Sequence, residues 1–302
     1  SEEYIGYFNN RSGESFTPFL DSLIQKSIVY QGMANGKRSI EAIPAILAGM
    51  PSLMNEPYIT STYSMNKIEG LPQILKRNGY HTSFFHGAYN GSMNFDSFVK
   101  SIGVDEYYGM DEYNNLADYD GNWGIFDEPF LQFMANKLSE FPQPFFTGVF
   151  TLSSHHPYTI PEQHKDRFAK GEIPILETVM YVDYALKKFF EEAETTDWYS
   201  NTLFIITADH TAQAMADEYK TDYGMYKIPM ILYHPAADTA YRSTHIFQQI
   251  DLMPTLIDYL KLNEPSLCFG KSIYQTEGGY HVAYRNGYYQ LLKDSYLLRF
   301  NG

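Results

Sequence analysis

The chain has 302 residues, of which 44% are hydrophobic and 19% charged, so it can bury a large core and a mainly disordered state is excluded. Its formal net charge of −14 repels the phosphates of nucleic acids, which excludes a general nucleic acid-binding role but leaves room for a local phosphate site. The only cysteine, Cys268, cannot form an internal disulfide, and no apolar run is long enough to predict a membrane span.

Apolar runs typical of buried strands alternate with segments of helical periodicity. In chain order, the predicted elements are helices at Pro18–Ser27, Ile40–Ala48 and Leu71–Asn78, a strand at Thr82–His86, a helix at Glu128–Glu140, a strand at Phe145–Leu152, a helix at Leu176–Glu194, strands at Leu203–Ala208 and Pro229–Tyr233, a helix at Gln249–Leu260, and a hairpin at Tyr280–Arg299 around Asn286-Gly287. Strands that are apolar on both faces suit a parallel sheet covered by helices. We therefore predict an α/β fold with a mostly parallel central sheet between helices, in one domain spanning residues 1–302.

The first candidate site is Ala34–Ser39, a glycine-containing turn that leads into a predicted helix. Ser39 falls at the helix start, where backbone N–H groups favour an anion, and Lys37 and Arg38 add positive charge beside its hydroxyl. A serine in this position can attack phosphorus when a metal ion lowers the pKa of its hydroxyl. The alternative is that Ser39 is an ordinary helix N-cap.

Two loops add further candidates. Asp120–Asp127 is a turn that carries Trp123, which either lines a substrate cleft or is simply packed. Ser153–Tyr158 follows a predicted strand and carries His155 and His156. A histidine at the carboxyl end of a strand can bind a phosphoryl oxygen or protonate a leaving group, although a lone histidine is more often structural.

Thr207-Ala208-Asp209-His210 directly follows the apolar strand at residues 203–206. Adjacent Asp and His side chains at the carboxyl end of a strand can offer an oxygen and a nitrogen to one divalent metal ion. The alternative is that Asp209 caps the next turn and His210 hydrogen-bonds to it.

Seven blocks of the chain, in this order, resemble the sulfatase-fold family of the alkaline phosphatase superfamily that includes lipoteichoic acid synthases and phosphoethanolamine transferases. The blocks are Thr17–Ser27, Asn35–Leu53, Phe84–Gly87, Trp123–Glu128, Ser153–Pro161, Ile206–Thr211 and Ile250–Leu260, and they cover nearly the whole chain. By this resemblance, Ser39 is the nucleophile and a metal ligand, and Asp209 and His210 are further metal ligands. His155 holds the substrate phosphate, Trp123 lies near the head group, and Arg38 contacts the substrate.

The resemblance also implies parts that this sequence does not contain. A glutamate that ends the first core strand is a further metal ligand in the family, and its position would lie just upstream of Ser1. We therefore expect the 302-residue chain to lack that strand, that ligand and an upstream membrane segment, so that metal can be absent from this fragment. Formylglycine chemistry is rejected, because Ser39–Ile43 lacks the Pro/Ala and Arg of the modification motif.

The predicted activity is the metal-dependent transfer of a phosphoglycerol- or phosphoethanolamine-type group from a phospholipid to an acceptor glycan or glycolipid, through a phosphoryl group on Ser39. The alternatives are a sulfatase-like phosphodiesterase, in which water replaces the acceptor, and an inactive module that binds head groups or glycans. One divalent ion is expected, Mn or Zn rather than Mg, because imidazole is a poor ligand for Mg. The resemblance places the domain on the extracytoplasmic face of a cell membrane.

Overall fold

The structure is a computed structural model that describes residues 1–9 and 15–301. Its helices are α1 (Pro18–Ile24), α2 (Ser39–Ala48), α3 (Leu71–Arg77), α4 (Phe95–Ser101), α5 (Met110–Tyr113), α6 (Asp127–Glu140), α7 (Ile175–Ala193), α8 (Asp217–Lys220) and α9 (Leu252–Tyr259). Its strands are β1 (Ile28–Met33), β2 (His81–His86), β3 (Glu106–Tyr108), β4 (Phe145–Phe150), β5 (Phe204–Thr207), β6 (Lys227–Tyr233), β7 (Tyr241–Gln248), β8 (His281–Arg285), β9 (Tyr288–Lys293) and β10 (Tyr296–Asn301). No helix in the described ranges has both the length and the apolar character needed to cross a bilayer.

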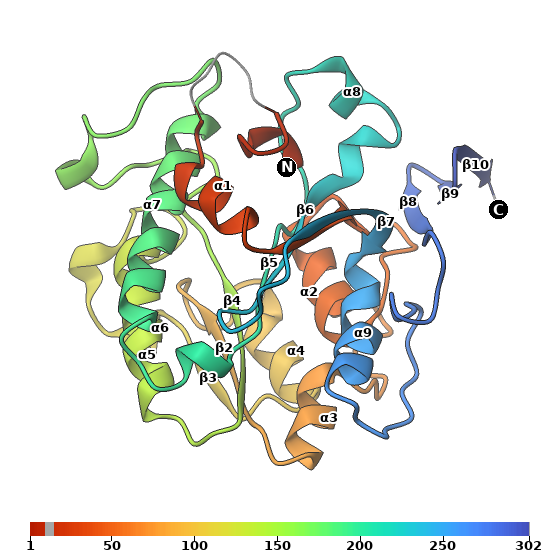
Figure 1. Cartoon of the computed structure of the whole chain (residues 1–302), viewed down its shortest axis with the longest axis horizontal. Helices are drawn as coiled ribbons and strands as arrows, with labels where there is room; N and C mark the ends of the chain where they lie inside the picture. Colours follow the sequence, from red (N-terminus) through yellow and green to blue (C-terminus); the bar gives the residue numbers. More distant parts are fainter. Residues whose placement is uncertain (10–14, 302) are drawn as a thin grey trace.

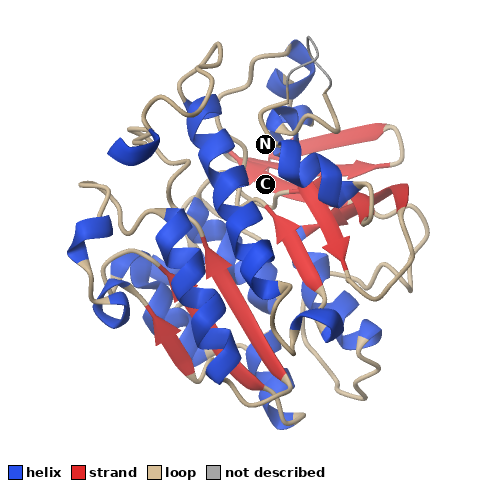
Figure 2. Ribbon diagram, turned by 60° about the vertical axis from the view of Figure 1, so that its left-hand side comes forward, coloured by secondary structure: helices blue, strands red, loops and turns tan. Residues whose placement is uncertain are grey.

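Two central sheets lie between layers of helices (Figures 1 and 2). The first sheet has the order β3-β2-β4 and is entirely parallel. The second has the order β5-β6-β1-β7, in which β6 runs antiparallel to both of its neighbours and β7 runs parallel to β1. The predicted α/β fold is confirmed, but the second sheet is mixed, because an apolar run predicts a strand without showing its direction.

The core forms on both faces of the central sheets. Neighbouring residues of β2 point to opposite faces, as the pleat of a strand requires. Phe85 packs with Phe130 of α6 in one apolar cluster that also includes α7, and Phe84 packs with Ile43 of α2 and Phe98 of α4 in another. This places α6 and α7 on one face and α2, α3, α4 and α9 on the other (Figure 1).

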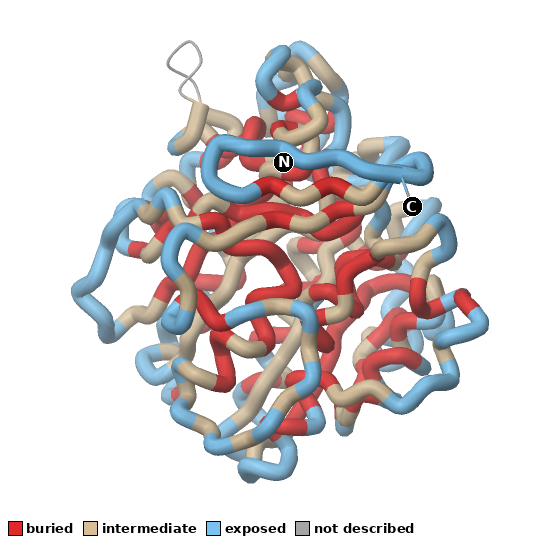
Figure 3. Tube along the Cα trace, turned by 90° about the vertical axis from the view of Figure 1, so that its right-hand side faces the viewer, coloured by how far each residue is buried: buried red, intermediate tan, exposed pale blue. Residues whose placement is uncertain are grey.

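A short antiparallel sheet, β10-β9-β8, ends the chain. The predicted hairpin is confirmed, and Asn286 and Gly287 both have positive φ, 51° and 83°, as a two-residue hairpin turn requires. The third strand, β10, lies exposed along one side of the molecule (Figure 3).

Most predicted elements occur within a few residues of their expected bounds, and the end of β4 shows why bounds shift. The strand was expected to reach Leu152 but ends at Phe150. The backbone N–H groups of Leu152 and Ser153 instead donate to the carboxylate of Asp127, at 2.8 and 3.1 Å. A side chain thus replaces the neighbouring strand as the hydrogen-bond partner.

Candidate active site

Ser39 is the first residue of α2, and its hydroxyl meets the residues that follow β5. Ser39 Oγ donates a hydrogen bond to Asp209 Oδ2 at 2.5 Å and lies 3.5 Å from His210 Nε2. Convergence of these three side chains was predicted from the sequence, and it is confirmed. Their catalytic and metal-binding roles remain predictions.

The Ser39 hydroxyl does not cap its own helix, contrary to the alternative interpretation. The cap is supplied by Glu41, whose Oε2 accepts hydrogen bonds from the backbone N–H groups of Lys37 and Arg38 at 2.8 and 3.0 Å. Gly36 makes this possible through close approach, because a Cβ atom there would lie 2.5 Å from Glu41 Oε2. The tight turn therefore leaves the Ser39 hydroxyl available at the positive end of the α2 dipole.

The hydrogen bonds of His210 fix its ring in the form that binds a metal ion. Its Nδ1 lies 2.8 Å from the carbonyl oxygen of Thr211, which can only accept, so Nδ1 carries the proton. In a neutral ring Nε2 then carries the lone pair, and this atom lies 3.3 Å from Asp209 Oδ2. The His210 backbone N–H donates to Asp209 Oδ1 at 2.8 Å, so the local contact of the alternative interpretation is present, while Oδ2 is directed at Ser39.

A carboxylate oxygen, an imidazole nitrogen and a hydroxyl oxygen that converge in this way suit Zn or Mn better than Mg. They supply three of the about four ligands that such an ion needs. Over residues 1–9 and 15–301 there is no group of three or more His, Cys, Asp and Glu side chains able to hold a metal ion. The residues present therefore fit one divalent ion only if further ligands join them.

A buried amide network supports the site and was not anticipated from the sequence. Gln249 Nε2 donates to the carbonyl oxygens of Ala208 and Asp209 at 2.9 and 2.7 Å. Gln249 Oε1 accepts from the backbone N–H of Asn35 at 2.9 Å. One side chain thus joins the turn before Ser39 to the metal-ligand candidates after β5. The sequence does not indicate this role, because a lone glutamine in a predicted helix has no distinguishing pattern.

The two cations beside Ser39 point to different partners. Lys37 Nζ donates to the hydroxyl of Thr211 and to the carbonyl oxygen of Met225, so it lies beside the residue that follows His210. Burial lowers the pKa of Lys37 to about 8. Arg38 is exposed and forms an ion pair with Glu41 at 2.5 Å. The role of Arg38 as a substrate contact stays a prediction.

Trp123 and His155 come together in a second cluster. Their ring centroids are 4.2 Å apart, and Trp123 Nε1 donates to the carbonyl oxygen of His156 at 2.6 Å. Both side chains are exposed, with Trp123 at 38%. In the part of the chain that the structure describes, no hydrogen bond joins this cluster to Ser39.

Asp127, at the start of α6, anchors the loop that carries His155. Its carboxylate accepts the N–H groups of Leu152 and Ser153, and its own N–H donates to Ser153 Oγ at 3.0 Å. Burial raises the pKa of Asp127 to about 6. The position of His155 thus depends on a buried carboxyl group that the sequence did not single out.

Comparison with known proteins identifies the family of the chain. The family model described as sulfatase matches residues 2–262. The lipoteichoic acid synthase-like protein YvgJ of Bacillus subtilis is 27% identical over 301 residues, which are 91% of this chain and 48% of the relative. The chain therefore spans about half the length of the curated relatives it matches.

Two solved structures share the fold. An alkaline phosphatase superfamily protein from Vibrio parahaemolyticus has a TM-score of 0.84 and 26% identity, over 99% of this chain and 74% of that one. The lipoteichoic acid synthase LtaP from Listeria monocytogenes has a TM-score of 0.83 and 20% identity, over 96% and 79% of the two chains.

Proposed function

The chain belongs to the sulfatase family, and from this premise we propose that it transfers a phosphoglycerol- or phosphoethanolamine-type group from a phospholipid to an acceptor alcohol. The observation that carries the proposal is the contact of Ser39 Oγ with both Asp209 and His210, at 2.5 and 3.5 Å. Similarity to lipoteichoic acid synthase-like YvgJ, at 27% identity, supports phosphoglycerol transfer over sulfate ester hydrolysis.

The proposed reaction has two displacements at phosphorus. In the first, Ser39 Oγ bonds to phosphorus, the bond from phosphorus to the lipid alcohol oxygen breaks, and the Ser39 proton passes to Asp209 Oδ2 along their hydrogen bond. The departing alcohol takes a proton from solvent. In the second, the acceptor hydroxyl oxygen bonds to phosphorus, the Ser39 ester breaks, the proton of the acceptor passes to Ser39 Oγ, and Asp209 returns its proton to solvent, which restores both groups.

A divalent ion held by Asp209, His210 and Ser39 would supply Lewis acidity that lowers the pKa of the serine hydroxyl. The residues of the chain orient the reactants. The start of α2 places Ser39 where backbone N–H groups and the helix dipole favour a phosphate, and Lys37 adds a nearby cation. His155, Trp123 and Arg38 are proposed as contacts of the phosphoryl group and the head group.

The proposed setting follows from the substrate. A phospholipid donor and a glycan or glycolipid acceptor place the domain at a membrane, and the similarity to lipoteichoic acid synthases supports its extracytoplasmic face. The second candidate function is hydrolysis, in which water is the acceptor; the exposure of His155 and Trp123 leaves their side of the site open to water.

The test is mass spectrometry of the purified longer protein after incubation with phosphatidylglycerol or phosphatidylethanolamine and a divalent metal ion. We expect the head-group phosphate on the peptide that carries Ser39, diacylglycerol as a product, and transfer to an added glycolipid. Release of free glycerophosphate or phosphoethanolamine despite added acceptor would assign the protein to the hydrolases. Labelling of a residue other than Ser39 would reject the assigned nucleophile.

A further inference from the structure

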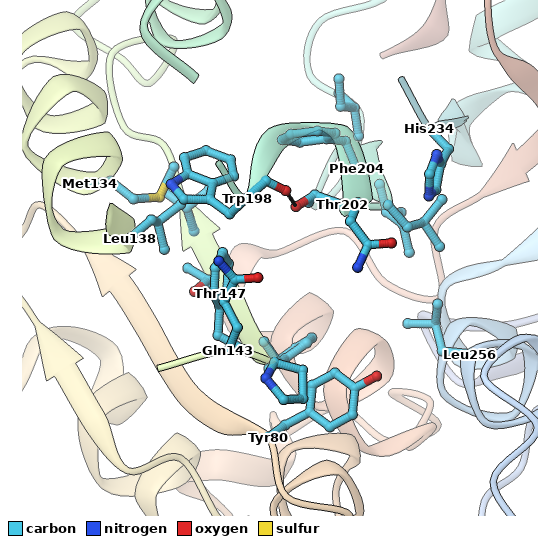
Figure 4. Close-up of a pocket in the computed structure, with 18 of the residues that line it drawn as sticks. Tyr80, Met134, Leu138, Gln143, Thr147, Trp198, Thr202, Phe204, His234 and Leu256 are labelled. Carbon is cyan, nitrogen blue, oxygen red and sulfur yellow. Dashed lines mark hydrogen bonds between the residues drawn. The ribbon is translucent and has the colours of Figure 1, made fainter. Parts of the chain in front are cut away.

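The segment that carries the candidate metal ligands leaves β5 beside an apolar groove. Phe204 of β5 and Thr147 of β4 line this groove, which has a volume of about 720 Å³ and lies between the two central sheets (Figure 4). In the described part of the chain, the pairing of β5 with β6 ends at Thr207, so Asp209 and His210 lie beyond it. Side chains from distant parts of the sequence hold this segment instead.

Lys37 is the cation among these side chains. Its Nζ donates to the hydroxyl of Thr211, to the carbonyl oxygen of Thr211 at 3.4 Å and to the carbonyl oxygen of Met225 at 2.9 Å. It also lies 5.9 Å from the centroid of the Tyr226 ring. An ammonium group has three N–H donors, so these three oxygens account for all of them. No N–H of Lys37 is then left to donate to a phosphoryl oxygen of the substrate.

Thr211 connects Lys37 to His210. The Thr211 carbonyl oxygen accepts from Lys37 Nζ at 3.4 Å and from His210 Nδ1 at 2.8 Å. The Thr211 hydroxyl donates to the carbonyl oxygen of Met225, and the residue is buried. A carbonyl oxygen has two lone pairs, which here serve the ammonium and the imidazole. The orientation of this carbonyl group therefore determines where the His210 ring places its Nδ1 proton.

The hydrogen bond at Nδ1 directs the opposite edge of the ring toward the candidate active site. His210 Nε2 lies 3.5 Å from Ser39 Oγ and 3.3 Å from Asp209 Oδ2. A hydrogen bond to the nitrogen that does not bind metal holds the ring and its tautomer, and its loss typically lowers metal affinity about 10–100-fold. Lys37 acts on the acceptor of that hydrogen bond.

Lys37 also joins the two ends of the excursion that the chain makes between β5 and β6. Thr211 begins this excursion and Met225 lies near its end, and both accept from the same ammonium group. The backbone of Lys37 is fixed as well, because its N–H donates to Glu41 Oε2 at 2.8 Å. The turn before Ser39 is thus coupled to the segment after β5 through a second side chain besides Gln249.

We propose that Lys37 is a positioning residue that acts on His210 through the Thr211 carbonyl group. It keeps the proton of the His210 ring on Nδ1 and Nε2 directed at the site, and it does not contact the substrate phosphate. The inference rests on the role of His210 as a metal ligand in the proposed function. Its first test reads the His210 ring itself, so its outcome does not depend on whether the protein transfers a head group.

The first experiment is NMR of the metal-free protein with isotope-labelled histidine rings, at about pH 9, where an imidazole ring is neutral. The His210 signals are assigned by comparison with His210→Gln. We expect one His210 tautomer in the parent, protonated on Nδ1, and a second tautomer, protonated on Nε2, in Lys37→Met. Lys37→Arg keeps N–H donors and charge, so it should restore the parent tautomer. An unchanged tautomer in Lys37→Met would overturn the proposal.

The matched control is Lys227→Met. Lys227 is half-buried like Lys37, but its Nζ lies over the rings of Tyr219 and Tyr223, at 5.4 and 5.3 Å from their centroids. This variant should leave the His210 tautomer as it is in the parent. The same change of tautomer in both lysine variants would assign the effect to a general loosening of the fold and would count against a specific role of Lys37.

Zn binding and phosphate binding separate positioning from direct contact with the substrate. In the longer protein, Lys37→Met should weaken Zn binding about 10–100-fold, as expected when a contact that orients a ligand is lost. At saturating Zn, titration with inorganic phosphate should give the same affinity in this variant and in the parent. Weaker phosphate binding with unchanged Zn affinity would make Lys37 a substrate contact and reject the proposal.

Discussion

Gln249 and Asp209 are joined by a hydrogen bond of 2.7 Å from the Gln249 side-chain amide to the Asp209 backbone carbonyl. The same side-chain nitrogen also donates to the Ala208 carbonyl oxygen, and the side-chain oxygen accepts a hydrogen bond from the Asn35 backbone N–H. Gln249 is fully buried. Gln249 therefore fixes the backbone positions of the turn before Ser39 and of the segment after β5, without contacting the Ser39 hydroxyl.

We predict that Gln249→Leu lowers metal affinity about 10–100-fold, the range typical of residues that orient metal ligands from behind. The Asp209 carbonyl and the Asn35 N–H would lose their partner, which also costs roughly 1–3 kcal/mol of stability. Isothermal titration of the longer protein with Zn and Mn measures the affinity. The matched control is Gln290→Leu, at a buried glutamine in β9. The same loss of affinity in both variants would show a general effect of buried amides.

We predict that Ser39→Ala abolishes transfer and leaves the fold intact. The hydroxyl donates to Asp209 but does not cap α2, so its loss should cost no more than about 1 kcal/mol of stability. Product analysis and thermal unfolding of the variant, in the longer protein, check the two parts. The control is Ser27→Ala, which removes a buried hydroxyl bonded to the Leu23 carbonyl. Transfer at the parent rate by the Ser39 variant would show that another group attacks phosphorus.

The sequence predicted those parts of the fold whose residues are apolar on a regular period. The apolar runs of β2, β4, β5 and β6 were found in this way, and so was the Asn286-Gly287 turn. β7 was missed because its first half, Tyr241–His245, is polar and largely exposed, so it lacks the apolar run by which the other strands were found. β1 was missed because Gln31 and Gly32 interrupt its apolar pattern. Gly32 is needed there, since a Cβ atom would lie 2.3 Å from the Ile228 carbonyl oxygen of β6.

The same limit applies to the site. Ser39, Asp209 and His210 were candidates because a helix start and a strand end are local features with known chemistry, and the family resemblance then assigned their roles. Gln249 and Asp127 act on backbone groups that are distant in sequence, through contacts that only the folded chain creates. The different partners of Lys37 and Arg38 also depend on the fold. Arg38 forms an ion pair with Glu41, whereas Lys37 donates a hydrogen bond to Thr211.

Asp183 predicts a pH dependence of stability. Its carboxylate accepts the N–H groups of Phe19 and Leu20 at the start of α1, and burial raises its pKa to about 6. The unfolded chain loses this proton near pH ~3.9, so the folded state binds more protons between about pH 4 and 6. The contribution of this proton to the free energy of unfolding is fully present below about pH 4. Roughly 2–3 kcal/mol of this stability is lost as the pH rises to about 6.

Asp183→Asn carries no charge at any of these pH values, so its stability should fall less steeply over the same window. Urea unfolding of parent and variant at several values between about pH 4 and 7 gives the two slopes. Other buried carboxyl groups, such as Asp127, contribute equally to both proteins and cancel in the difference. Identical slopes would show that Asp183 does not titrate between the folded and unfolded states as predicted.

The last prediction separates His155 from His156. His155 Nδ1 lies 2.9 Å from the His156 carbonyl oxygen, so Nδ1 donates and a hydrogen bond from Nε2 to a phosphoryl oxygen requires a ring protonated on both nitrogens. If His155 stabilises charge on the phosphoryl group in this way, His155→Ala should lower kcat about 10²–10³-fold. Metal content should not change, because no contact joins His155 to Asp209 or His210 among the described residues.

His156 contributes its backbone carbonyl to Trp123 and to His155, and alanine keeps that carbonyl. His156→Ala is therefore the matched control and should retain most of the activity. Both variants, made in the longer protein, need turnover and metal analysis side by side. Loss of metal from the His155 variant would make His155 a ligand, and equal loss of activity in both variants would mean that the pair acts through the shape of the loop. Only a selective loss of kcat in His155→Ala, with metal retained, supports binding of the phosphoryl group by this side chain.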